Sequence, residues 1–281
     1  MDTSELKITT ASGEKHHFSA KKVAHSLRKS GADQSVIAGI LQKIESELYE
    51  GITTKEIYNR AYKLLRKKDS LFASRYKLKN AIFELGPTGY PFEKFVAAVL
   101  QNSGYKVEVG KVVQGSCVTH EIDVIARKDN IKLFIECKFH SEHGNNCNVK
   151  VPLYIHSRFQ DIQKFFQKKH DPEEFFNEGW VVTNTRFTKD ALDYGKCVDL
   201  HLLSWDTPKG SSLKERIDES GLYPITVSEL LSQREKQFLL SRDVVLCRDL
   251  IHDRFFLDHL GVSETRKKKI LKEMQQLCKM Q

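Results

Sequence analysis

Hydrophobic positions in the first third of the chain follow a helical spacing behind a short alternating segment. At residues 53–56 the order Thr-Thr-Lys-Glu predicts a helix start, with Thr53 as N-cap and Glu56 completing a capping box. Apolar residues then recur every three or four positions, as on one face of a helix. The elements expected here are a hairpin over 6–20 and helices from 19, over 35–49, after 53 and over 71–84.

The middle of the chain changes to an alternation of strand-like and helical patterns. Two glycines and two prolines within residues 86–91 mark the boundary, because this composition cannot continue a helix. After it we expect helices from 92, around 157–168 and over 188–196, strands over 105–109, 121–127, 131–138, 180–184 and 198–204, and short helices in the tail over 212–281. The fold class predicted is α/β, with a mainly helical N-terminal module, a mixed-sheet core and a helical C-terminal region.

The composition limits which classes of protein this chain can belong to. The 281 residues are 40% hydrophobic and 29% charged, which is an ordinary globular balance, and no stretch is apolar enough to span a membrane. Six scattered cysteines without a CxxC pair favour reduced thiols and a cytoplasmic location. The net charge is +8, and residues 1–85 contribute +6 of it, from 16 Lys and Arg against 10 Asp and Glu. This excess fits either a phosphate-bearing partner or an ordinary solvated surface.

The strongest chemical signal lies on two strand-like runs joined by a polar turn. Alternation puts Glu121 and Asp123 on the face opposite to Ile122, Val124 and Ala126. On the second run, Glu136 and Lys138 share a face, so an antiparallel pairing can bring Asp123, Glu136 and Lys138 together.

Such a set has the parts that phosphodiester hydrolysis needs. Two carboxylates on neighbouring strands can hold Mg²⁺, which polarises a phosphoryl oxygen and activates water, and a lysine can stabilise the developing charge. The alternative is that Asp123, Glu136 and Lys138 form the solvated face of a two-stranded ribbon.

Two weaker signals each have an ordinary alternative. The spacing His140-x2-His143-x3-Cys147 offers zinc ligands, but it lacks a convincing fourth one, and a polar loop explains it as well. Arg158 or Gln160 can face a cleft or lie on a solvated helix start.

The order Asp123-x12-Glu136-Cys137-Lys138 resembles the PD-(D/E)xK nuclease signature, and more narrowly the Mrr-like type IV restriction endonucleases. Phe92-Glu93, Gly104-Tyr105 and the run at 180–184 occur in the order that family shows, so the resemblance covers about residues 86–205. It implies a restriction-endonuclease-like α/β/α core. It also implies Asp123 and Glu136 as ligands of Mg²⁺ or Mn²⁺, Lys138 as the catalytic lysine and Glu93 as a further catalytic carboxylate.

Residues 5–85 are similar to the ATP-cone, a regulatory nucleotide-binding domain. Gly13, Phe18-x3-Lys22-Val23 and the segment Gly51–Tyr58 carry this resemblance. It implies binding of ATP or dATP as an allosteric ligand, with Lys22 as a phosphate contact. The basic pair usual in that family is replaced here by Thr10-Ala11, which leaves nucleotide binding open.

The sequence therefore predicts an ATP-cone-like domain at 5–85, a nuclease domain at 86–205 and a helical region at 206–281. The function expected is a Mg²⁺-dependent endonuclease of restriction or defence type, acting on DNA and regulated by a nucleotide. The alternatives are a non-catalytic, nucleotide-responsive DNA-binding regulator, or a structure-specific or RNA nuclease. No membrane partner is expected, and a homodimer is left open.

Overall fold

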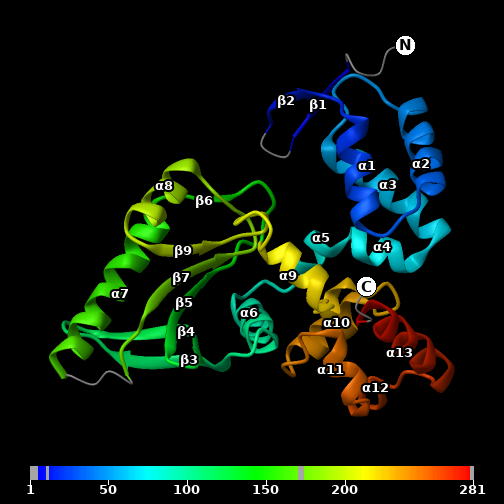
Figure 1. The fold of residues 1–281 in the computed structure, drawn as a ribbon. Coiled ribbons are helices and arrows are strands. Elements are labelled where there is room, and N and C mark those ends of the chain that lie inside the picture. The colour runs from blue at the N-terminus through cyan, green and yellow to red at the C-terminus, as the bar shows by residue number, and fades with distance from the viewer. Residues whose placement is uncertain (1–5, 11–12, 170–173, 279–281) are drawn as a thin grey trace.

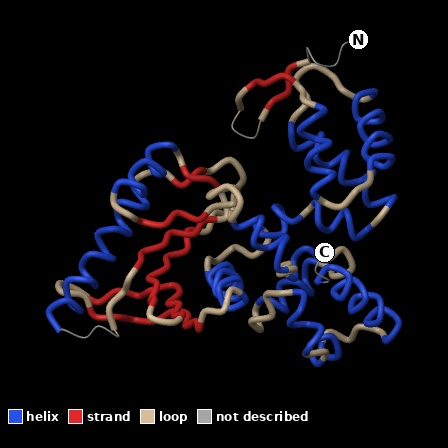
Figure 2. Tube along the Cα trace, in the orientation of Figure 1, coloured by secondary structure: helices blue, strands red, loops and turns tan. Residues whose placement is uncertain are grey.

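The computed structural model describes residues 6–10, 13–169 and 174–278. Strands concentrate in one body, apart from a small hairpin near the N-terminus, and helices make up the remainder (Figures 1 and 2). None of the helices described is long and apolar enough to cross a membrane. Buried hydrophobic side chains form three clusters, and these clusters show how the segments are joined.

The N-terminal module is a hairpin followed by helices, as the hydrophobic pattern predicts. Its elements are β1 (Lys7–Thr9), β2 (Lys15–His17), α1 (Ala20–Lys29), α2 (Gln34–Ser46), α3 (Thr54–Lys68) and α4 (Ser70–Tyr76). The predicted capping box is confirmed: Thr53 Oγ1 accepts from the Glu56 amide, and the Glu56 carboxylate accepts from the Thr53 amide. One cluster, which includes Leu27, Ile44 and Leu65, forms the core of this module.

The second body is built on a five-stranded mixed sheet in the order β3-β4-β5-β7-β9. The first three strands are antiparallel, and β5, β7 and β9 run parallel. Helix α6 packs on one face, and α7 and α8 pack on the other, which gives an α/β/α arrangement consistent with the predicted nuclease core (Figure 1). The bounds are α6 Tyr90–Asn102, β3 Lys106–Gln114, β4 Thr119–Lys128, β5 Ile131–Lys138, α7 Lys150–Lys169, β7 Glu178–Thr183, α8 Lys189–Cys197 and β9 Leu200–Leu203. A small parallel pair, β6 (Asn146–Cys147) with β8 (Arg186–Phe187), lies beside this sheet.

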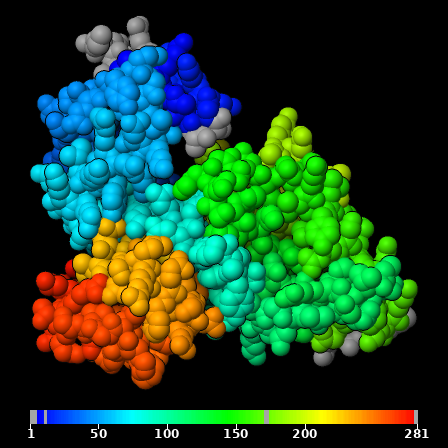
Figure 3. Space-filling model, turned by 180° about the vertical axis from the view of Figure 1, so that it is seen from behind, coloured from blue at the N-terminus to red at the C-terminus, as the bar shows by residue number. Residues whose placement is uncertain are grey.

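The C-terminal helices share a core with the sheet. The cluster that contains α6 and one sheet face also takes in side chains from the C-terminal helices and from α5. Thr226 Oγ1 donates to the carbonyl of Ala81 at 2.6 Å, which ties this region to α5. The remaining elements are α5 (Leu78–Phe83), α9 (Leu213–Ser220), η1 (Ile225–Val227), α10 (Gln233–Leu240), α11 (Cys247–His252), α12 (Phe255–His259) and α13 (Glu264–Cys278). In the space-filling view the N-terminal module and the C-terminal helices lie one above the other, with the sheet body alongside (Figure 3).

Two predicted helices differ from the structure. The helix expected over 71–84 is divided at Lys77 into α4 and α5. The division arises because Ala73 belongs to the core of the N-terminal module, whereas Leu78 belongs to the core shared with the sheet. Helix α7 begins at Lys150, earlier than expected. Pro152 does not prevent this start, because it lies in the first turn, where backbone amide groups have no intrahelical partner.

Candidate active site

Strands β4 and β5 bring Asp123 and Glu136 together where their pairing ends. Val124 pairs with Ile135, so the next step along both strands would set Asp123 opposite Glu136. At that step the Asp123 carboxylate accepts a hydrogen bond from the amide of Cys137 at 2.7 Å. The side chain thus replaces a backbone partner and holds its carboxylate beside Glu136.

The face expected for Ile122 is wrong. Val124 and Ala126 pack into the core shared with α6, but Ile122 packs with Ile125 and Phe134 in the cluster against α7. On the N-terminal side of Val124, β4 no longer pairs with β5 and keeps only β3 as a partner. The strand is therefore free to twist at Asp123, and the simple alternation of faces is lost there.

Glu136 is almost entirely buried, at 7% exposure. Burial, and then the negative charge of Asp123, raise the pKa of Glu136 to about 8, although Arg158 acts in the opposite direction. Arg158 on α7 forms an ion pair with Glu136, with Nη1 and Oε1 2.6 Å apart, and donates a hydrogen bond to the carbonyl of Glu121. Glu136 Oε1 is buried, and the Arg158 guanidinium is its charged partner. Of the two orientations considered for Arg158, the structure shows the one facing the site.

Glu93 enters the site from the first turn of α6. Burial raises its pKa to about 7, and the charges of Asp123 and Glu121 add to the shift. Burial is also the main reason that the pKa of Asp123 is raised. A Cβ atom at Gly89 would lie 3.3 Å from Glu93 Oε1, so the glycine leaves room for this carboxylate.

Lys138 ends β5, on the side of that strand which its two-residue period shares with Glu136. Its side chain is exposed, and Thr183 Oγ1 donates to its carbonyl at 2.7 Å, which ties the strand end to β7. Within the described ranges, no carboxylate lies within ion-pair distance of the Lys138 ammonium. The lysine is thus available to an anionic ligand.

The zinc alternative finds no support in the arrangement of its three residues. The His140 amide donates to the Asn184 side chain, the His143 ring packs 3.9 Å from the Phe83 ring, and Cys147 is buried against α7 and α8. In the part of the chain that the structure describes, no three His, Cys, Asp or Glu side chains are placed to hold a metal ion. The acidic site likewise lacks a set of three such side chains among the described residues; it offers two adjacent carboxylates, those of Asp123 and Glu136.

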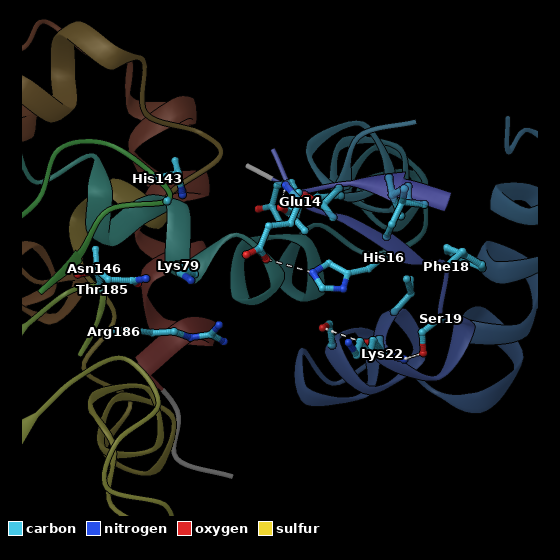
Figure 4. A pocket seen from close by; sticks show the side chains of 18 of the residues that line it. Glu14, His16, Phe18, Ser19, Lys22, Lys79, His143, Asn146, Thr185 and Arg186 are labelled. Carbon is cyan, nitrogen blue, oxygen red and sulfur yellow. Dashed lines mark hydrogen bonds and ion pairs between the residues drawn. The ribbon is translucent and has the colours of Figure 1, made fainter. Parts of the chain in front are cut away.

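Lys22 lies away from the acidic site, in a cavity of about 740 Å³ at the N-terminal module. It stands in the first turn of α1, where Ser19 is the N-cap. Thr10 also lines this cavity, whereas Ala11 lies outside the described residues. On the opposite side, Lys79 and Arg186 line it (Figure 4). No pattern in the sequence indicates these two residues, because they come from segments more than 100 residues apart.

The two later regions of the chain each match a known protein family. Residues 87–207 match a family model described as restriction endonuclease, and residues 223–278 match one described as AF1548-like, C-terminal. An uncharacterized protein of Archaeoglobus fulgidus is 30% identical over 179 residues, which are 63% of this chain and 97% of that protein. The chain belongs to the AF1548-like family.

This chain is also similar in fold to a solved structure. The crystal structure of a protein of unknown function, AF1548, superimposes with a TM-score of 0.56 at 29% identity, covering 68% of this chain and 98% of that one. The family match over residues 87–207 supports the expected restriction-endonuclease domain and suggests a nuclease. Both matched ranges begin after the N-terminal module, so its resemblance to the ATP-cone stays a prediction.

The raised pKa of Glu136 predicts a pH dependence of stability. An ordinary glutamate in the unfolded chain loses its proton near pH 4.5, whereas Glu136 in the fold keeps it to about pH 8. Between these values the folded state binds more protons, so this group lowers the free energy of unfolding as the pH rises. In EDTA, the free energy of unfolding of Glu136→Gln minus that of wild type is expected to increase from about pH 5 to about pH 8. Urea unfolding at both pH values measures this, and a difference that does not change with pH contradicts it.

Proposed function

We propose that this chain is a Mg²⁺-dependent endonuclease that hydrolyses DNA phosphodiester bonds. The observation that carries the proposal is the junction of β4 and β5, where Asp123 and Glu136 lie side by side with raised pKa values. Glu136 is buried and Asp123 is half-buried, so their negative charges repel each other, and a divalent cation between them would relieve that repulsion. The restriction-endonuclease match over residues 87–207 covers this junction and supports the same reading.

The donor set fits a magnesium or manganese ion. Both are hard cations that prefer oxygen ligands, and the site brings carboxylate oxygens of Asp123 and Glu136 together. Asp123 and Glu136 would hold the ion, which when bound polarises a phosphoryl oxygen and lowers the pKa of its water.

The remaining roles belong to the chain's own side chains. Lys138 stands at the end of β5, and its ammonium has no carboxylate partner among the described residues, so it can stabilise the charge that develops on the phosphate. Glu93, with a pKa of about 7, can take up or release a proton at neutral pH. Arg158 offsets the charge of Glu136 and fixes its carboxylate against α7.

A plasmid-nicking assay tests the proposal. Wild type is expected to nick supercoiled DNA with Mg²⁺ and to lose this activity in EDTA. Lys138→Ala is expected to nick about a hundredfold more slowly, because it removes one charge-stabilising group from the transition state. Lys111→Ala, which removes an exposed lysine from β3, is the matched control and should nick as wild type. Equal rates for wild type and Lys138→Ala would refute the assignment, and branched DNA or RNA as the preferred substrate would redefine only the substrate.

A second candidate function concerns the N-terminal module, for which we propose binding of ATP or dATP. The supporting observation is the cavity of about 740 Å³ that contains Lys22 and Ser19 beside Phe18. Its volume is in the range of small-ligand sites, and it joins cationic and aromatic side chains as a nucleotide requires.

A further inference from the structure

The cavity beside Lys22 has two walls that come from different parts of the molecule. One wall is formed by the hairpin and α1, with His16, Ser19 and Lys22. The other comes from α5, from the loop between β5 and β6, and from β8, with Lys79, His143 and Arg186. Figure 4 shows these two groups of side chains facing one another across the gap.

The charges of the lining favour an anion. Its Lys and Arg residues are Lys22, Lys79 and Arg186, and its only acid among the described lining residues is Glu14, which pairs with His16 at 3.2 Å. Arg186 pairs with Asp206 at 2.6 Å but remains largely exposed. Lys79 is partly buried, and within the described ranges no carboxylate lies within 4 Å of its ammonium. This ammonium lies 5.9 Å from the centroid of the Trp205 ring. A partly desolvated cation with no carboxylate partner among the described residues is costly to maintain, and an anionic ligand would lower that cost.

The cavity also holds an aromatic surface. Tyr58 and Tyr76 stack with ring centroids 5.0 Å apart, and both line the cavity. A ligand with a flat ring can pack on these rings.

The wall on the sheet side continues directly into the candidate active site. The loop that carries His143 follows Lys138 at the end of β5, and its next part, β6, pairs Asn146 with Arg186 of β8. Asn184 binds both the amide and the carbonyl of His140, at 2.9 and 2.8 Å, and so holds the loop near its start. A ligand on this wall therefore contacts the segment that leaves the catalytic strand.

We propose that Lys79 and Arg186 complete, together with Lys22, a site that holds the phosphate groups of one ligand from both walls. The inference rests on the nucleotide-binding candidate above and adds residues outside the N-terminal hairpin and α1 to it. The ligand class is a phosphate ester with an aromatic base, for which a nucleoside triphosphate is the expected source. Its binding joins the N-terminal module to the loop after Lys138.

Calorimetry on the full chain in EDTA, with ATP as the probe, tests the site without requiring cleavage. Lys22→Met, Lys79→Met and Arg186→Gln are each expected to weaken ATP binding at least about tenfold, because each removes a charge-assisted contact. Lys21→Met and Lys189→Gln are the matched controls, since each removes an exposed lysine close in sequence but outside the cavity, and both should bind as wild type. Lys79→Arg, which keeps the charge, should retain most of the affinity and covers the case that Lys79→Met does not fold.

Each other outcome has a defined meaning. If Lys22→Met weakens binding while the Lys79 and Arg186 variants bind as wild type, the two-walled site is refuted and the nucleotide-binding candidate stands. If wild type binds neither ATP nor a single-stranded oligonucleotide, both are refuted and the nuclease proposal is untouched. If only the oligonucleotide binds, with the same loss in all three variants, the site is supported and its ligand is the nucleic acid backbone.

Discussion

Asp123→Asn is expected to lower the rate of Mg²⁺-dependent plasmid nicking at least about a thousandfold. Metal-ion catalysis contributes several kcal/mol of charge stabilisation in the transition state, and each 1.36 kcal/mol corresponds to about tenfold in rate. Asparagine has the same shape, and its carbonyl oxygen can still accept the hydrogen bond from the Cys137 amide. The change therefore removes the negative charge while keeping the junction of β4 and β5.

The matched control for this variant is Glu108→Gln on the neighbouring strand β3. Glu108 is an exposed acid whose partner, Lys111, lies on the same strand, so it should not affect cleavage. Mn²⁺ titration of both variants adds a measurement independent of turnover, and only Asp123→Asn should bind the ion more weakly. Wild-type nicking by Asp123→Asn would exclude this carboxylate from the reaction.

Phe92→Ala is expected to lower the free energy of unfolding by about 3–5 kcal/mol, because it removes a large buried ring and leaves a cavity. Phe92 has 0% exposure and lies in the core shared by α6, the sheet and the C-terminal helices. Trp180 and Trp205, the two tryptophans of the chain, belong to the same core. Their fluorescence during urea unfolding therefore reports directly on this part of the structure.

Tyr90→Ala on the same helix is the control for Phe92→Ala. The Tyr90 side chain is 46% exposed and lies beside the Lys94 ammonium, 5.2 Å from its ring centroid. Exposed substitutions usually change stability by less than about 0.5 kcal/mol, and a cation–π contact at the surface adds about as much again. Equal losses for the two variants would contradict the division between a buried and an exposed face of α6.

Local signals in the sequence were sufficient for most elements. The capping box at Thr53 and Glu56, the N-terminal hairpin and the two strands that carry Asp123 and Glu136 are all confirmed. These predictions succeeded because hydrogen bonds between near neighbours and the alternation of polar and apolar residues are encoded within a few positions.

Other features depended on contacts between distant segments and were predicted wrongly or not at all. The division of the expected helix at Lys77 follows from two cores that each take one half of it. The face of Ile122 follows from the loss of pairing between β4 and β5, which no single-strand pattern reveals. The wall formed by Lys79 and Arg186 required α5 to lie against the sheet edge.

The order of residues thus predicted which side chains could do chemistry, because it indicated that Asp123, Glu136 and Lys138 lie on two adjacent strands with a short turn between them. It did not establish the environment of those side chains. Burial of Glu136, its pairing with Arg158 and the approach of Glu93 arise when α6 and α7 close over the sheet from opposite sides. Desolvation and charge–charge distances are properties of the packed chain, and they depend on segments that are remote in sequence.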